Sequence, residues 1–234
     1  MRTSILLWLF AIVTLVPGCG RLWAQPDDRR MANLEQAAVT AQNRGDYAAA
    51  AKFWTDLLTE FPQLPRRGEA LHNSGLCQAK LGHYQEAVGQ LSEALATLST
   101  DATESLARAH LYLGFSQLEW AKQESLSNPD TAQTLFRSAA ETLEKMVERF
   151  PKYSALHEGL FFLGTAYENL DQPERAAAAF EKLIEVPQAT FYLDGLFGLG
   201  YAHEQLQHWE RARQAYIRYL NECGDHAARD EVRL

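Results

Sequence analysis

The sequence predicts an all-α protein, an α-solenoid built from five antiparallel helix pairs. The prediction depends on two sets of small residues, each of which recurs once per repeat, and on the nearly constant distance between the two sets. We call each set a column. The first column is Ala38, Gly75, Gly114, Gly164 and Gly200, and the second is Ala50, Ala87, Ala139, Ala176 and Ala212. The first recurs at separations of 37, 39, 50 and 36 residues. The second follows it by 12 positions in every repeat except the third, where it follows by 25.

Contact between paired helices explains why these positions are small. At each of them the backbone of one helix is expected to press on its partner, where a large side chain would force the two apart. Large apolar residues surround the columns at the i, i+3, i+4 spacing of amphipathic helices. They are Leu34, Leu71, Leu160 and Leu196 on the first helices and Trp54, Leu91, Leu143, Phe180 and Tyr216 on the second.

Turn signals separate the two helices of a pair, and proline ends three of the second helices. The turns are Gly45-Asp46-Tyr47, Gly82-His83-Tyr84, Asp171-Gln172-Pro173 and Gln207-His208-Trp209, and the breakers are Pro62, Pro151 and Pro187. These signals predict repeats over residues 31–64, 68–101, 107–153, 157–190 and 193–226. Residues 25–30 are expected to form a short linker and residues 227–234 a tail or an incomplete helix.

The third repeat carries an insertion between Trp120 and Thr134, about 13 residues long. The insertion predicts two lengthened helices that project from the solenoid, with Asn128 as the cap of the second and Pro129 in its first turn. Two interpretations are open: a contact arm for a partner, or a surface extension of the kind that loops tolerate.

The order of signals within each repeat resembles the tetratricopeptide repeat family over residues 31–226. A small residue is followed by a turn, by an aromatic residue such as Tyr47 or Tyr84, by Ala three positions later, and by a closing Pro. The usual period of the family is 34 residues, so the longer spacings here imply lengthened helices or linkers. The resemblance implies a right-handed superhelix in which each pair contacts only its neighbours.

Residues 1–24 have the pattern of a secretory signal peptide, with Arg2 followed by an uncharged apolar run from Ile5 to Val16. That run is too short to span a bilayer, which needs about 20 apolar residues. Two cleavage sites are open. The segment before Cys19 resembles a bacterial lipobox, which implies lipidation of Cys19, and Ala24 suits an ordinary signal peptidase. Either site predicts an exported protein that is periplasmic or associated with the outer membrane.

Charge and residue spacing exclude several classes of function. The net charge is −8, from 22 basic and 30 acidic residues, and no basic cluster suits nucleic acid. The three cysteines cannot form a disulfide framework. His203 and His208 lack the i, i+4 spacing of a zinc site, and His110 is expected to be a core residue with a hydrogen-bonded ring. We therefore expect no enzyme, no metal and no cofactor.

The family resemblance also implies a concave groove lined by the first helices. Its register places the following residues on the groove: Leu76, Arg108, Leu111, Phe115, Leu118, Glu158, Phe161, Asp194, Phe197, Tyr201 and Glu204, with Glu168 on the same acidic rim. An apolar floor with acidic borders favours a protein or peptide partner that presents basic or apolar side chains. The alternative is a tightly curled superhelix in which the aromatic residues pack on one another.

Two linkers suggest a narrower resemblance. Residues 61–65 (FPQLP) and 150–154 (FPKYS) are similar to linkers of the bacterial envelope branch of the family, which includes the outer-membrane-assembly lipoprotein BamD and the periplasmic protein CpoB. The expected function is a non-catalytic scaffold for protein–protein interactions in the cell envelope. Two alternatives stay open: a BamD-like lipoprotein, and a structural subunit that oligomerises through its repeat ends. The oligomeric state is not predicted.

Overall fold

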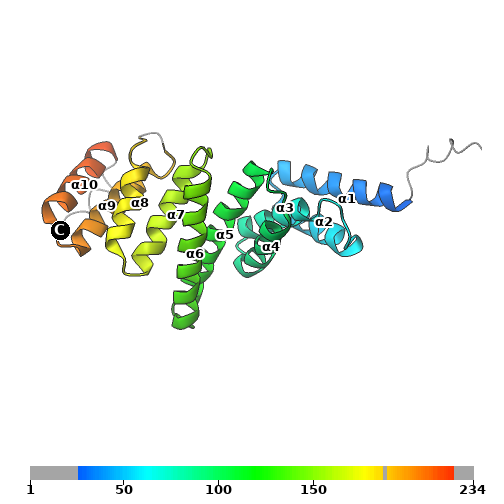
Figure 1. The fold of residues 1–234 in the computed structure, drawn as a ribbon, viewed down its shortest axis with the longest axis horizontal. Helices are drawn as coiled ribbons and strands as arrows, with labels where there is room; N and C mark the ends of the chain where they lie inside the picture. Colours follow the sequence, from blue (N-terminus) through cyan, green and yellow to red (C-terminus); the bar gives the residue numbers. More distant parts are fainter. Residues whose placement is uncertain (1–25, 187–188, 224–234) are drawn as a thin grey trace, which may run out of the picture.

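The computed structural model describes residues 26–186 and 189–223 and, within them, contains ten helices and no strand (Figure 1). The helices are α1 (Pro26–Asn43), α2 (Tyr47–Glu60), α3 (Arg67–Lys80), α4 (Tyr84–Thr97), α5 (Thr103–Glu124), α6 (Pro129–Arg149), α7 (Leu156–Asn169), α8 (Pro173–Leu183), α9 (Tyr192–Gln205) and α10 (Trp209–Glu222). They form five antiparallel pairs, which confirms the predicted α-solenoid. The expected signal peptide, Cys19 and the tail 227–234 lie outside the described residues.

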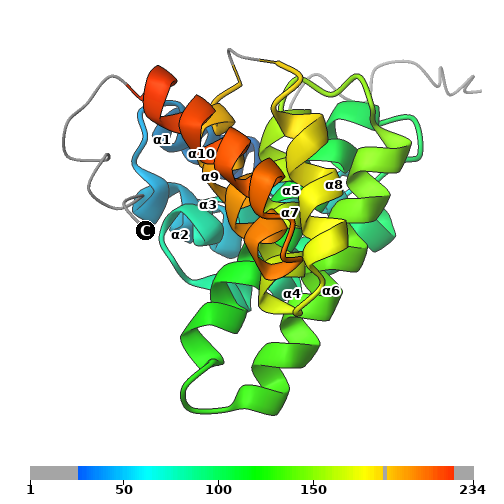
Figure 2. The same ribbon diagram turned by 90° about the vertical axis from the view of Figure 1, so that its left-hand side faces the viewer.

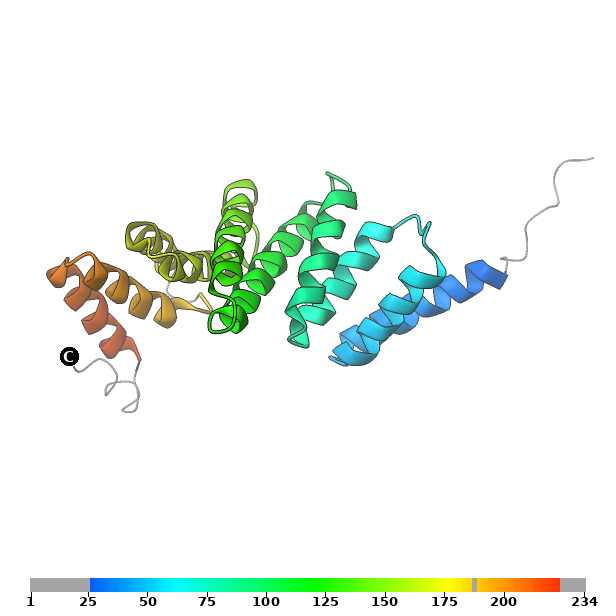
Figure 3. The same ribbon diagram turned by 90° about the horizontal axis from the view of Figure 1, so that it is seen from below.

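The helix pairs stack in one curved row from α1 to α10, as Figures 1 and 3 show. Each helix packs against the next along the chain. The first helices α3, α5, α7 and α9 also contact one another across the pairs. These direct contacts place the first helices on the inner side of the curve, where the family resemblance expects a groove.

The small-residue columns are contact points between helices, as predicted. A Cβ atom on Gly75 would lie 2.7 Å from Leu91 Cγ, and one on Gly164 would lie 2.5 Å from Phe180 Cε1. In the same way Gly114 faces Leu143 and Gly200 faces Tyr216. Each glycine therefore makes room for the large apolar residue of the partner helix, and all five alanines of the second column are buried.

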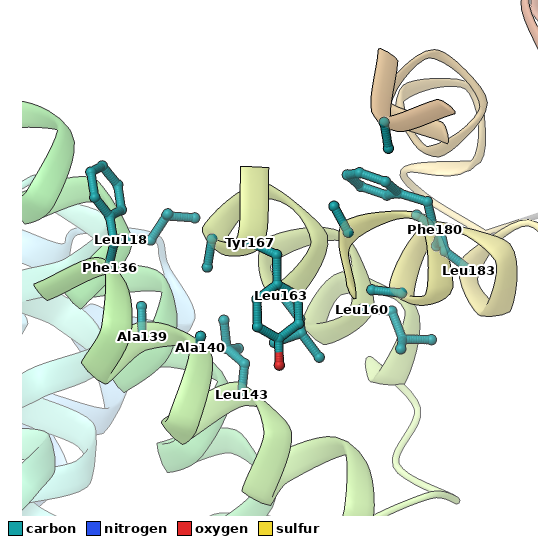
Figure 4. Close-up of a cluster of buried hydrophobic side chains, with 14 of the residues drawn as sticks. Leu118, Phe136, Ala139, Ala140, Leu143, Leu160, Leu163, Tyr167, Phe180 and Leu183 are labelled. Atoms are coloured by element: carbon teal, nitrogen blue, oxygen red, sulfur yellow. The ribbon is translucent and has the colours of Figure 1, made fainter. Parts of the chain in front are cut away.

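The main hydrophobic core runs through the C-terminal three repeats. Leu118 and Leu143 come from the α5–α6 pair, Leu163 and Tyr167 from α7, and Phe180 from α8, and they meet in one continuous cluster (Figure 4). A separate cluster around Trp54 and Leu57 joins α1, α2 and α3. The apolar residues predicted at helical spacing thus bury the faces between neighbouring pairs.

Four of the five turns within a pair share one backbone conformation. Gly45 and Gly82 have φ angles of +76° and +78°, and Asp171 and Gln207 occupy the equivalent positions at +53° and +58°. These angles lie in the left-handed region, which glycine adopts without a steric penalty. The turn sequence predicted the location of these bends, but Gln207 carries no residue signal for a left-handed angle.

The third pair is longer than the others, as the insertion predicts. Helices α5 and α6 contain 22 and 21 residues, whereas α3 and α7 contain 14 each. Their shared end projects from the row of helices (Figure 2), and Leu126 at its tip is 98% exposed. Asn128 occupies the cap position of α6, but its side chain accepts no hydrogen bond from the first turn of the helix, and its amide donates to Glu124 instead.

Helix α1 corrects the predicted linker over residues 25–30. The helix begins at Pro26, so residues 26–30 belong to the first repeat. Asp27 and Asp28 lie in its first turn, where acidic side chains interact favourably with the helix dipole. Arg30 also pairs with Glu60 at the end of α2 at 2.9 Å, which attaches this extra turn to the partner helix.

The buried histidines correct a second expectation. His110 is buried as predicted, but its Nδ1 atom has no hydrogen-bond partner within the described residues. Its ring lies 5.9 Å from that of Phe150. Burial, reinforced by the charges of the nearby Arg149 and Lys145, lowers the pKa of His110 to about 4. His72 is also buried without a partner for Nδ1, and burial together with Arg108 lowers its pKa to about 4.

Candidate protein-binding groove

Three of the residues predicted to line the groove are buried. Leu76, Leu111 and Leu118 are covered by neighbouring helices, and the last two belong to the main core. The prediction that they are accessible to a partner is therefore wrong. The physical reason is the direct contact of α3 with α5 and of α5 with α7, which closes the inner surface over the middle of the solenoid.

The aromatic residues of the middle repeats pack on one another. The Phe115 ring meets Tyr84 edge-on with centroids 5.9 Å apart, and it lies 5.0 Å from Phe162. Arg108, on the same helix, forms an ion pair with Glu104 at 2.8 Å. In this part of the inner surface, the alternative of self-packed aromatic residues therefore describes the molecule better than an open groove.

An open hollow of about 470 Å³ lies between the C-terminal first helices, and we call it the α7–α9 groove. Five predicted residues meet there: Phe161 and Glu168 from α7, and Asp194, Phe197 and Tyr201 from α9. Phe197 and Tyr201 are 37% and 43% exposed, which is high for aromatic side chains. The remaining lining residues are Thr165, Phe180, Gly198 and Tyr219.

The floor of the α7–α9 groove is the ring of Phe180, which is almost fully buried. This ring fits between two glycines, because a Cβ atom on Gly164 or Gly198 would lie 2.5 or 2.7 Å from it. The walls are held by aromatic contacts. Phe161 stacks on Phe191 with centroids 4.4 Å apart, and Phe197 packs 5.7 Å from Tyr219. The hollow thus has a rigid apolar base.

A second hollow of about 240 Å³ adjoins the α7–α9 groove. Glu168 and Tyr201 line both spaces, so the two hollows share one wall. Its other lining residues are Asp171, Pro173, Ala202 and Gln205. Two adjoining spaces of this kind can accommodate several side chains of an extended or helical segment.

The acidic residues of the predicted rim have different environments. Asp194 and Glu168 line the α7–α9 groove itself. Glu204 accepts a hydrogen bond from the Tyr216 hydroxyl at 2.9 Å, and Glu158 lies in the first turn of α7, outside the lining. Burial raises the pKa of Glu168 to about 7, and Lys122 opposes this shift only in part.

Sequence reasoning missed the contribution of the second helices to this groove. Phe180 on α8 was expected to be a core residue, yet it lines the hollow together with Tyr219 of α10. Gly198 was also overlooked, although it admits the Phe180 ring. A weak signal was present, since Gly195, Gly198 and Gly200 place three glycines on one helix, which indicates close approach by neighbouring side chains.

A larger hollow of about 550 Å³ lies outside the predicted groove, between the start of α5 and the linker from α6 to α7. Phe150 and Tyr153 contribute its aromatic surface, and Arg149 and Lys152 its positive charge. The Arg149 guanidinium lies over the Phe150 ring at 5.3 Å. This hollow is opposite in charge to the α7–α9 groove, so the two surfaces suit different ligands.

Within residues 26–186 and 189–223, His, Cys, Asp and Glu side chains form no group of three or more that could hold a metal ion. The rings of His203 and His208 have centroids 5.8 Å apart. In that same part of the chain, every helix is too short or too polar to span a lipid bilayer.

The stacked pairs and their inner groove define a helical-repeat protein of the class that binds partners on an extended concave surface. A family model described as tetratricopeptide repeat matches residues 36–103 and 161–228, which are more than half of the chain. The chain therefore belongs to the tetratricopeptide repeat (TPR) family, whose fold is a scaffold for protein–protein interactions. The two matched segments flank the lengthened third pair.

Solved structures share this fold at low sequence identity. A crystal structure of MamA is 16% identical with a TM-score of 0.62, over 87% of this chain and 96% of that one. MamA from Desulfovibrio magneticus RS-1 is 18% identical with a TM-score of 0.64, over 82% and 94% of the two chains. TTC0263, a TPR protein of Thermus thermophilus, is 17% identical with a TM-score of 0.55, over 85% and 94%. No curated protein matches the chain.

Proposed function

We propose that this TPR protein is a non-catalytic scaffold of the bacterial cell envelope and that its α7–α9 groove holds a segment of a partner protein. The observation that carries the proposal is the groove, in which Phe197 and Tyr201 stay exposed beside a hollow of about 470 Å³. Exposed aromatic side chains next to an apolar hollow are typical of surfaces that bind another protein.

The chemistry of the lining favours a partner segment with basic or apolar side chains. Three carboxylates, those of Glu168, Asp171 and Asp194, line the two adjoining hollows, and no Lys, Arg or His is among the lining residues. The same charge would repel the phosphates of a nucleic acid. Apolar contact is provided by Phe161, Phe180 and Phe197.

The envelope location is proposed from the sequence. Residues 1–24 have the signal-peptide pattern, and the two Phe-Pro linkers resemble those of the envelope branch of the family. Cys19 is the residue through which a lipid would attach the protein to a membrane. In the unlipidated alternative the mature protein is periplasmic and begins at Gln25.

Two alternative functions each have a specific observation in their favour. The Phe-Pro linkers favour a BamD-like lipoprotein of outer-membrane protein assembly. The last helix favours a structural subunit that oligomerises through its repeat ends, since Trp209 and Ile217 on α10 are 63% and 42% exposed. Exposed apolar side chains on the last described helix offer a surface on which a further helix pair can stack.

We expect a photo-crosslinking amino acid at Phe197 to capture a discrete partner in living cells. Phe197 lines the groove and is partly exposed, so a segment bound there lies within reach of the crosslinker. Tyr201→Lys in the same protein is expected to reduce the yield about tenfold or more, because it replaces an exposed aromatic wall with a positive charge that repels a basic segment. The yield is measured by immunoblot of the crosslinked product.

The matched control carries the crosslinker at Glu174, which is exposed on α8 and lies outside the groove. The same products from both positions, or an unchanged yield in a folded Tyr201→Lys variant, would contradict the groove as the partner site. Thermal unfolding of each variant checks that the solenoid is intact. Phe161 is less suitable for substitution, because its ring stacks on Phe191 and supports the groove wall.

Cys19→Ser is expected to abolish labelling of the protein by an alkyne fatty acid and to release it from the membrane fraction. Only a cysteine thiol at this position can carry the lipid. If the variant and the unchanged protein fractionate identically, the lipoprotein hypothesis fails. N-terminal sequencing then distinguishes cleavage after Ala24 from an uncleaved segment.

A further inference from the structure

Glu168 is the carboxylate at the junction of the two hollows. It lies near the end of α7 and lines both the α7–α9 groove and the smaller adjoining space. Within the described residues its carboxylate makes neither a hydrogen bond nor an ion pair. Lys122, the cation whose field acts on it, is already paired with Glu119 at 2.6 Å. The groove therefore contains an acidic group with an unused bonding capacity.

Partial burial makes this unpaired carboxylate costly to ionise. Burial removes water from Glu168 and no donor from residues 26–186 or 189–223 replaces that water, so the pKa of the group is raised to about 7. A partner that brings a cation to this position supplies the missing donor and the missing charge. The other rim acid with a buried environment, Glu204, already has the Tyr216 hydroxyl as its donor.

The walls next to Glu168 suit the rest of a basic side chain. The Tyr201 ring lines both hollows beside the carboxylate, so a cation at this junction lies close to an aromatic surface. The methylene groups of a lysine or arginine can lie along such a wall while the charged end reaches the acid. Beyond it, Phe161, Phe180 and Phe197 line the hollow and can contact a neighbouring hydrophobic residue.

We propose that Glu168 forms a cation subsite of the α7–α9 groove, which takes the ammonium or guanidinium group of a lysine or arginine while an adjacent apolar side chain of the same segment enters the hollow over Phe180. The proposal rests on the proposed function, because it assigns the chemistry of the partner segment at that site. It makes Glu168 the residue that determines preference for a basic partner.

The charge state of Glu168 makes binding at this subsite depend on pH, since only the ionised carboxylate attracts a cation. The charged and titratable groups around it are Lys122 on α5, Asp171 in the turn before α8, Asp194 and Tyr201 on α9, and Tyr216 and Tyr219 on α10. On the other side of α7, Glu144 of α6 and Arg175 of α8 pair with each other. The cation is therefore expected to bind more weakly below pH 6.

The test compares two small probes of equal shape, 4-phenylbutylammonium and 4-phenylbutan-1-ol, in titrations of the ¹⁵N-labelled protein followed by the amide signals of Gly198 and Tyr201. At pH 8 the ammonium is expected to bind about tenfold more tightly than the alcohol, the effect of one charge-assisted contact. Glu168→Gln is expected to reduce this ratio to about one while leaving the affinity for the alcohol unchanged. At pH 5.5 the ratio of ammonium affinity to alcohol affinity in the unaltered protein is also expected to decrease toward one.

Glu174→Gln, on the exposed face of α8, is the matched control and should leave the ratio unchanged. The proposal is overturned if the protein binds both probes with equal affinity or binds neither of them. It is also overturned if the ratio of the two affinities is unchanged in Glu168→Gln, or is lost only in Asp194→Asn. The outcome is independent of the crosslinking result. If the protein prefers the ammonium probe but no partner is captured, the cation subsite is supported and the scaffold proposal fails. If a partner is captured but the protein does not prefer the ammonium probe, the scaffold proposal is supported and the subsite fails.

Discussion

Gly164→Leu is expected to lower the free energy of unfolding by about 3 kcal/mol or more, the upper part of the range for overpacked cores. A Cβ atom at this position would already lie 2.5 Å from the Phe180 ring, which is almost fully buried and cannot move aside. Helices α7 and α8 must then separate, and the floor of the α7–α9 groove is lost with them. Urea unfolding followed by circular dichroism measures the change.

Gly89→Leu is the matched control for this substitution. Gly89 lies on the exposed side of α4, where an added Cβ has no neighbour within 4 Å. Leucine also has the higher helix propensity, by nearly 1 kcal/mol. The control is therefore expected to be neutral or stabilising. If both variants have the same stability as the unaltered protein, the small-residue column does not mark contacts between helices.

Acidification is expected to destabilise the fold through His72 and His110, by about 2 kcal/mol for each at pH 5 relative to pH 7.5. Both pKa values are about 4 in the folded protein, below the value of 6.5 for an unperturbed histidine. The unfolded chain therefore binds more protons than the folded chain between pH 6.5 and pH 4. The free energy of unfolding must decrease as the pH falls through this range.

His110→Leu separates this effect from the titration of carboxylates. Leucine occupies the equivalent position in the four other repeats, and each of those leucines is buried, so the variant should fold. At pH 7.5 its stability is expected to lie within about 1 kcal/mol of the unaltered protein. At pH 5 it should be more stable by about 2 kcal/mol. An identical pH dependence for the two proteins in urea unfolding would contradict the assignment.

Local sequence signals were sufficient to predict the helices and their pairing. Gly164 and Ala176 are small because each touches the partner helix, and that constraint acts over only 12 positions of the chain. The turn at Gly82 is equally local, since its left-handed backbone angle depends on one residue. Contacts of short range leave a pattern in the sequence, so the five pairs could be read directly.

The accessible part of the inner surface could not be predicted in the same way. Leu111 and Phe197 occupy equivalent positions of their repeats, yet Leu111 is buried and Phe197 is partly exposed. The difference depends on how closely successive first helices approach, which is set by packing between pairs. No residue within one repeat encodes that distance, so Leu76, Leu111 and Leu118 were assigned wrongly to an open groove.

The role of Glu168 also depends on contacts that the register does not reveal. Its position on the acidic rim followed from the repeat pattern, but its partial burial and lack of a donor did not. Glu204 belongs to the same predicted rim and differs because the Tyr216 hydroxyl reaches it. Repeat positions predict which direction a side chain faces, whereas its ionisation depends on neighbours from other elements.

The lengthened α5–α6 pair has a consequence for how such a protein can change over evolution. Its additional residues extend the two helices along their own axes, and α5 still contacts α7 in the way that α7 contacts α9. The solenoid thus has two independent directions of growth: whole pairs lengthen the row, and longer helices within one pair raise a ridge across it. Such a ridge can be gained, reshaped or lost while the neighbouring repeats keep the same inner surface for a bound segment.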